Sequence, residues 1–215
     1  MNNFIFYFFL FFIYSVLGWI VEVTYVGFID KKVVNRGFLI GPYLPIYGYS
    51  AIIMVLYLNQ YKENPLTVFI LAMVVCTFLE YITSYIMEKI FKARWWDYSN
   101  LKFNINARVC LKNSLLFGIL SIILIYLLNP LLVKLINKMN NTWLIVITII
   151  CLVIYLVDKI ISFNIVMKLK KNFDEFKFDA TMEIRKLIDQ KIKRRYLQNR
   201  IFSAFPMIKF FRNKN

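Results

Sequence analysis

The 215-residue chain contains no histidine. This absence excludes histidine-based acid–base catalysis, histidine-ligated metal sites and histidine-ligated haem. Only three cysteines are present, Cys76, Cys110 and Cys151, and their spacing matches no zinc or redox motif. Because all three lie in or beside apolar stretches, we interpret them as packing residues. The sequence therefore predicts neither a metal centre nor a cofactor.

Acidic residues are scarce, with 12 Asp and Glu against 27 Lys and Arg and a net charge of +15. A pI near 9.7 would suit a nucleic-acid-binding protein. The basic residues instead flank apolar spans, so we expect no nucleic-acid partner. A Walker A loop and a nucleophile elbow are both missing, which excludes ATP hydrolysis by a P-loop route. We expect no enzymatic activity.

Long apolar runs dominate the chain. It is 60% hydrophobic with a mean hydropathy of +0.60, which is too apolar for a soluble domain of this length. No Lys or Arg precedes residues 4–20 and no small-residue cleavage site follows them, so we interpret them as part of an uncleaved first span. Each apolar run reaches the ~20 residues that cross a bilayer. The sequence predicts an all-α polytopic membrane protein with about five transmembrane helices, at residues 4–28, 38–58, 66–88, 109–128 and 142–167.

The basic residues predict how these spans are oriented. The loop 29–37 carries three Lys or Arg, the region 89–112 carries six, and the tail beyond residue 167 carries fourteen. The other side has only Lys62, Lys134 and Lys138. Because positive loops stay cytoplasmic, we expect the N-terminus outside and the C-terminus inside. We divide the chain into a transmembrane domain, 1–168, and a basic amphipathic cytoplasmic tail, 169–215.

Three acidic side chains, Glu22, Glu80 and Asp158, lie within the predicted spans, where ionisable groups are costly. Each shares a helical face with small or polar residues, so these faces should turn toward other helices. All three acids fall at similar depth in the cytoplasmic half, near Arg36 and Arg108. We expect one polar cluster of these five residues. It would lock helices together, line a substrate or ion path, or form a catalytic site.

The second span begins in an unusual way at residues 35–48. Asn35 and Arg36 are followed by three glycines and two prolines within twelve residues, which would interrupt a regular helix. Transporters use such broken helices to direct free N–H groups at ligands. Alternatively, Pro42 and Pro45 mark the first turns of an ordinary helix.

A second motif occupies residues 94–111 between two spans. Its aromatic side chains suit the headgroup layer, where such rings anchor membrane proteins. Its polar residues exceed what anchoring needs, and a lid or a partner-docking surface is the alternative. The candidate residues are Trp95, Trp96, Asp97, Tyr98, Asn104 and Asn106, with Arg108 at the end of the motif.

The tail combines apolar positions at helical spacing over 173–200 with a cationic face, and continues into an aromatic and basic segment, 201–212. Such a segment favours an anionic membrane surface. Docking to a cytoplasmic partner, such as an ATPase, is the competing interpretation.

These motifs resemble the putative ABC-transporter type IV family of bacterial membrane proteins over roughly residues 10–120. Ala107 stands where we expect glycine in that family, a departure that stiffens the turn. The resemblance implies a permease subunit whose ATPase is a separate chain, with homodimerisation supplying ten spans. It is carried by Tyr14-Ser15, Gly18-Trp19, Glu22, the run from Asn35 to Gly48, Leu79-Glu80-Tyr81, Glu88, the run from Arg94 to Ser99, Phe103-Asn104, Asn106, Arg108 and Cys110-Leu111.

Three functions remain open from the sequence. The first is a permease-like transport component that moves an unknown substrate. The second is a non-transport scaffold or regulator that binds lipid or protein at the cytoplasmic face. The third, a membrane-embedded enzyme acting through the carboxylates and arginines, has no supporting motif.

Overall fold

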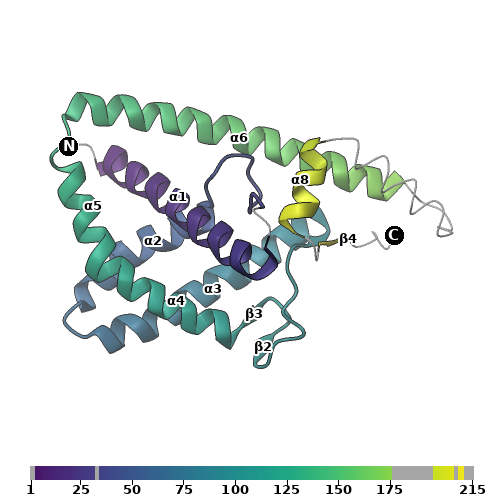
Figure 1. The fold of residues 1–215 in the computed structure, drawn as a ribbon, viewed down its shortest axis with the longest axis horizontal. Coiled ribbons are helices and arrows are strands. Elements are labelled where there is room, and N and C mark those ends of the chain that lie inside the picture. Colours follow the sequence, from purple (N-terminus) through teal and green to yellow (C-terminus); the bar gives the residue numbers. More distant parts are fainter. Residues whose placement is uncertain (1–2, 32–33, 176–195, 206–207, 211–215) are drawn as a thin grey trace.

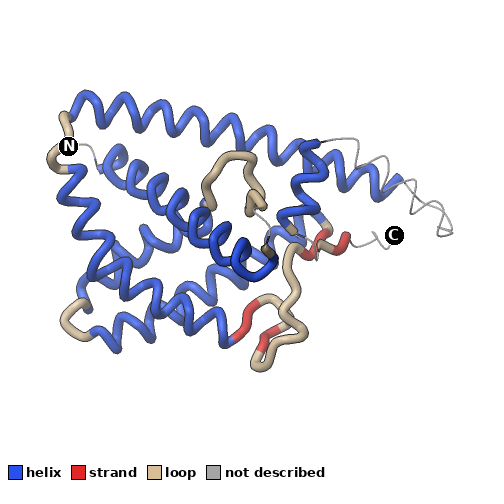
Figure 2. Tube along the Cα trace, in the orientation of Figure 1, coloured by secondary structure: helices blue, strands red, loops and turns tan. Residues whose placement is uncertain are grey.

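The computed structural model describes residues 3–31, 34–175, 196–205 and 208–210. Figures 1 and 2 show a fold built almost wholly of helices, with short strands near one end. Most of the predicted amphipathic tail segment, 176–195, lies outside the described residues.

Six helices form the main body of the described chain. They are α1 (Asn3–Asp30), α2 (Pro45–Leu58), α3 (Pro65–Phe91), α4 (Leu111–Ile123), α5 (Asn129–Ile136) and α6 (Asn141–Glu175). A 3-10 turn η1 (Asn59–Tyr61) follows α2, and a π-helical turn η2 (Leu124–Leu128) joins α4 to α5. The tail contributes α8 (Tyr196–Ala204).

The strands form two short antiparallel ladders. β1 (Ala93–Arg94) pairs with β4 (Lys209–Phe210) of the tail. β2 (Asn104–Ile105) pairs with β3 (Val109–Cys110) in a hairpin between α3 and α4. The region between these two helices is therefore folded onto the body, and its first strand is covered by the tail.

Four helical segments of the described chain are long and apolar enough to span a membrane. They are Asn3–Ile29, Pro65–Phe91, Leu111–Ile136 and Asn141–Lys170. The last of these confirms an apolar helix at 142–167, although α6 continues past the predicted domain boundary at 168. Most of their side chains face outward, as expected where lipid rather than protein covers the helices. The protein is thus a multi-pass membrane protein.

The second predicted span, 38–58, is not a full-length helix. α2 has 14 residues, about 21 Å, and begins with Pro45 at its first turn. Residues 34–44 before it are not helical. Both interpretations of the prolines therefore hold in part, because Pro45 starts a helix while Pro42 lies in the irregular segment. The count of five spans and the orientation stay predictions.

The helices begin and end at two opposite ends of the fold. The start of α1 and the turn between α5 and α6 lie together at what we call the N-terminal end (Figure 1). The end of α3, both ladders and α8 lie at the opposite end, which we call the tail end. The non-helical segment 34–44 connects α1, which finishes toward the tail end, to α2.

The π-helical turn η2 lies directly before Pro130. Proline cannot donate a backbone hydrogen bond, so the preceding carbonyl ladder must rearrange. Asn129 next to it is buried and accepts a hydrogen bond from the Tyr14 hydroxyl of α1 at 2.9 Å. The distorted turn thus carries a polar link between two spanning helices.

Close packing of α1 on α2 depends on two glycines. A Cβ placed on Gly18 would lie 2.3 Å from the Tyr47 ring. A Cβ placed on Gly48 would lie 2.2 Å from the Ser15 hydroxyl and 2.6 Å from the backbone oxygen of Phe11. Small residues let helix backbones approach in membranes, where packing rather than water exclusion drives association. These glycines therefore fix the separation of α1 and α2.

We predict that Gly48→Ala destabilises the protein by about 1–3 kcal/mol, because the added methyl meets backbone that cannot yield locally. Reversible unfolding in mixed detergent micelles measures the change. Val21→Ile adds one methylene at an outward-facing position of α1 and should leave the stability unchanged. Equal effects of the two variants would contradict the packing argument.

Candidate functional site

Asp158 of α6 binds the non-helical segment. Its carboxylate accepts hydrogen bonds from the backbone N–H groups of Ile40 at 3.0 Å and Gly41 at 2.8 Å. The Tyr43 hydroxyl donates to it at 2.6 Å and the Ser162 hydroxyl at 2.8 Å. Asp158 is only 8% exposed. Four donors therefore satisfy a buried carboxylate without any arginine.

The same segment is also tied to α1. Asn35 accepts a hydrogen bond from the Trp19 indole at 2.7 Å and donates to the Ile40 carbonyl at 2.8 Å. The Leu44 backbone N–H donates to the carbonyl of Ser15 at 2.8 Å. Irregular backbone survives at membrane depth only where protein satisfies its polar groups. Here α1 and α6 supply those partners from opposite sides.

Glu22 and Arg36 come together as predicted, although loosely. Arg36 Nε lies 4.0 Å from Glu22 Oε2, and the two side chains are 25% and 30% exposed. The stronger contact of Glu22 is the Tyr47 hydroxyl at 2.7 Å. Arg36 also donates to the carbonyl oxygen of Ala204 in α8. It thus links the first span to the tail.

Glu80 of α3 accepts a hydrogen bond from the Tyr98 hydroxyl at 3.0 Å. Burial raises the pKa of the Tyr98 hydroxyl, and the nearby carboxylates of Glu80 and Glu22 raise the pKa further. The hydroxyl therefore keeps its proton and donates a hydrogen bond to Glu80. Glu80 is 7% exposed, and its second oxygen, Oε2, has no hydrogen-bond partner within the described residues.

Arg108 pairs with Glu88 rather than with Glu22 or Glu80. Its Nη1 lies 2.8 Å from Glu88 Oε2 and 3.3 Å from the Ser84 hydroxyl, and Arg94 adds a contact to Glu88 at 3.2 Å. The physical reason is position, because Arg94 and Arg108 both lie at the tail end, where α3 finishes beside Glu88. The five residues predicted as one cluster therefore divide among three groups, around Asp158, around Glu22 with Glu80, and around Glu88.

The aromatic motif is folded inward. Trp95 is 2% exposed, and its ring makes edge-on contacts with Phe38, Phe91 and Phe205. The Trp96 indole donates to the carbonyl of Arg108 at 2.9 Å. Trp95 thus belongs to the internal packing at the tail end and is not at the molecular surface.

The polar residues of the motif shape its turns. Asp97 accepts from the backbone N–H of Ser99 at 3.0 Å, and Asn104 accepts from that of Ala107 at 3.1 Å. Asn106 donates to the Tyr81 hydroxyl of α3 at 2.9 Å. These side chains fold the loop and fasten it to α3, which accounts for polar content beyond that needed for anchoring.

Sequence reasoning missed Tyr43 and Tyr47 as hydrogen-bond donors to acids. Tyrosine in an apolar stretch is usually a packing residue, so neither position stood out. The available signal was that both tyrosines lie four residues apart in the glycine-rich motif 35–48. In the structure, where part of this motif is not helical, each hydroxyl donates to a carboxylate. Arg200 was also missed. It donates to the carbonyls of Gly37 at 3.3 Å and Phe38 at 3.0 Å.

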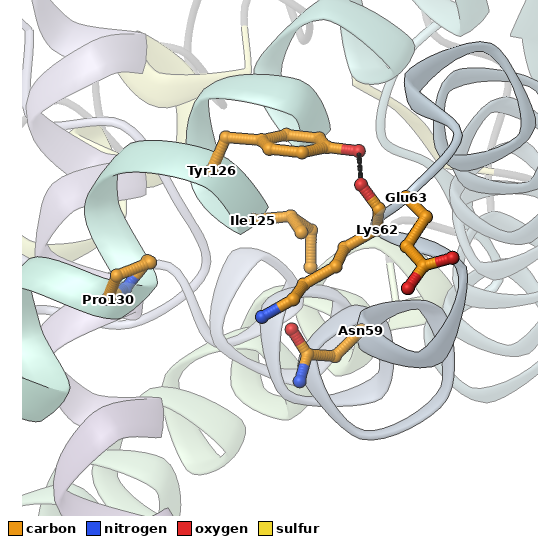
Figure 3. Close-up of a pocket in the computed structure, with 6 residues that line it drawn as sticks. All are labelled: Asn59, Lys62, Glu63, Ile125, Tyr126 and Pro130. Atoms are coloured by element: carbon orange, nitrogen blue, oxygen red, sulfur yellow. Dashed lines mark hydrogen bonds between the residues drawn. The ribbon is translucent and has the colours of Figure 1, made fainter.

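A shallow pocket of about 280 Å³ lies away from these groups. Figure 3 shows it between the turn after α2 and the π-helical turn, where the Tyr126 hydroxyl donates to the Lys62 carbonyl. None of the predicted site residues lines it. We therefore place the candidate site in the three polar groups rather than in this pocket.

Comparison with known protein families matches residues 9–163 to the family described as putative ABC-transporter type IV. The chain belongs to this family. The match confirms the resemblance and extends it through Asp158 and Ser162, so it includes all three polar groups. The tail lies outside the ABC-transporter type IV match. Comparisons with curated proteins and with solved structures gave no match.

We predict that Asp158→Asn costs about 3 kcal/mol, because an amide cannot accept from all four donors and turns its own N–H toward the segment. Tyr43→Phe removes one donor and should cost about 1 kcal/mol. Denaturation in detergent micelles measures both. A smaller loss for Asp158→Asn than for Tyr43→Phe would contradict the assigned role.

We predict that Ala107→Gly stabilises the protein by about 0.5–1 kcal/mol. Ala107 has φ +57°, a left-handed conformation that strains residues with a Cβ and that glycine adopts freely. Ala51→Gly, within helix α2, is the control and should destabilise by about 1 kcal/mol. Thermal unfolding midpoints compare the two, and a loss of stability in Ala107→Gly would refute the prediction.

Proposed function

We propose that this protein is the membrane component of a transport system, a permease-like subunit that moves its substrate with an ATPase carried on a separate chain. Membership of the ABC-transporter type IV family and the multi-pass fold support the proposal. The sequence has no P-loop, so any ATP hydrolysis must come from a partner. We assign no catalytic step to this chain and place it in a bacterial plasma membrane.

The observation that carries the proposal is the broken segment before α2. Transporters place discontinuous helices at their substrate and ion sites, where unwound backbone exposes polar groups inside the membrane. Residues 34–44 have this character, since they are non-helical and their N–H groups bind a buried carboxylate of another spanning helix. Such a segment can change partners without unfolding a whole helix.

Partners belong to the same proposal. Few spanning helices surround the segment, so a homodimer would complete a pathway that one copy lacks. The tail end offers the contact for an ATPase, because α8 and β4 fold against the aromatic motif there. In this arrangement, the tail would connect the ATPase to Arg36 and hence to the broken segment.

One observation favours the alternative, a scaffold or regulator at the cytoplasmic face. The carboxylates of Asp158, Glu22 and Glu88 all have partners within the chain, as a purely structural role requires. On this alternative, neutralising the acids would change stability and nothing else.

Purification from native cells in a mild detergent tests the proposal. We expect an ATP-binding subunit in stoichiometric amount, because permease subunits act only with their ATPase. An unrelated multi-pass protein purified with the same tag is the control for adventitious binding. Repeated absence of any ATP-binding chain would refute the transport proposal and leave the scaffold alternative.

A further inference from the structure

Glu80 is unusual among the buried acids of the described chain. Only 7% of the residue is exposed, and Tyr98 donates to one of its two oxygens. Asn113 of α4 also interacts with this carboxyl group as a hydrogen-bond donor, but within the described residues no donor meets full hydrogen-bond geometry at Oε2. An unpartnered carboxylate oxygen in a buried site is strongly unfavourable, because nothing replaces the water that it loses.

The cationic side chains near α3 do not relieve this cost. Arg94 and Arg108 both contact Glu88, which lies eight residues or about 12 Å further along the helix. Arg36 lies beside Glu22 at 4.0 Å, and Arg108 reaches the Ser84 hydroxyl, one helical turn from Glu80, at 3.3 Å. Within the described residues, no Lys or Arg forms an ion pair with Glu80 itself.

The groups around Glu80 come from four parts of the chain and are rich in oxygen. The Tyr98 hydroxyl donates to Glu80 and the Tyr47 hydroxyl donates to Glu22, and the Glu22 carboxylate acts electrostatically on Glu80. Carboxylate and hydroxyl oxygens are the ligands that hard cations prefer. The charged and titratable groups that face Glu80 are Glu22 from α1, Tyr47 from α2, Cys76 from α3, and Tyr98 from the connection to α4.

We propose that Glu80 and Glu22 form a binding site for one exchangeable positive charge, a proton or an alkali metal ion. The Tyr98 and Tyr47 hydroxyls hold the two carboxyl groups in place. Within the described residues, no group of three or more Cys, Asp or Glu side chains is placed to hold a metal ion together, so the ligand set does not suit a transition metal. The bound charge balances the pair and satisfies Oε2. The site stands whether or not the protein transports a substrate.

Thermal unfolding of the full-length protein in lipid nanodiscs tests this site in two arms. In the first arm, sodium or potassium chloride replaces N-methylglucamine chloride at constant ionic strength and pH. In the second, pH varies without alkali ions. A ligand that binds only the folded state raises the unfolding midpoint, by roughly 5 °C at saturation. An alkali-ion site responds in the first arm, and a proton site becomes more stable as pH falls in the second.

Glu80→Gln should remove the response, because the neutral amide takes up no proton in this pH range and has no negative charge for a cation to balance. Glu63→Gln, at an exposed acid near the N-terminal end, should keep it. If Glu80→Gln does not fold, Tyr98→Phe provides a second variant, which keeps the carboxyl group and should shift the response to higher ion concentration or a different pH. Identical behaviour of wild type and Glu80→Gln, or of wild type and Tyr98→Phe, in both arms would overturn the proposal.

Discussion

The hydrogen bonds between Asp158 and the backbone of residues 40–41 hold the rest of the structure in place. Without them, a non-helical segment would expose unpaired N–H groups inside the membrane, which is strongly unfavourable. With them, the chain can leave α1, turn within the body and start α2 late. The position of α2 then sets where Tyr47 meets Glu22 and where Gly48 meets α1. One carboxylate on α6 thus organises three helices that are distant in sequence.

Hydrophobicity predicted the long helices well, because an apolar run of sufficient length has few alternatives in a membrane. The runs 4–28 and 66–88 correspond to α1 and α3 within a few residues, and the run 142–167 lies within α6, which continues to Glu175. The short α2 could not be predicted this way, since hydropathy does not distinguish apolar helix from apolar irregular backbone. Only its glycines and prolines indicated a break, and the partner that stabilises the break lies more than a hundred residues away.

The acids were correctly placed on inward faces, but their partners were not. Depth along a helix can be estimated from sequence, whereas rotation around the bundle cannot. Arg108 shares a level with several acids, and the choice of Glu88 depends on how the hairpin folds back onto α3. Trp95 presents the same difficulty, because its aromatic neighbours come from three separate segments, one of them in the tail. The sequence alone therefore could not identify which side chains contact each other; that depends on the three-dimensional arrangement.

The contacts of α8 and β4 also order events during biosynthesis. Ribosomes make residues 196–210 after every spanning helix, so this segment is the last of the described chain to reach the folded helices. Until then, several groups of the earlier chain lack their final partners. These are the Arg36 side chain, the carbonyls of Gly37 and Phe38, and the edge of β1. The tail end is therefore completed last. A chain that is truncated after α6 would keep its membrane helices but would lack the contacts that α8 and β4 make with them.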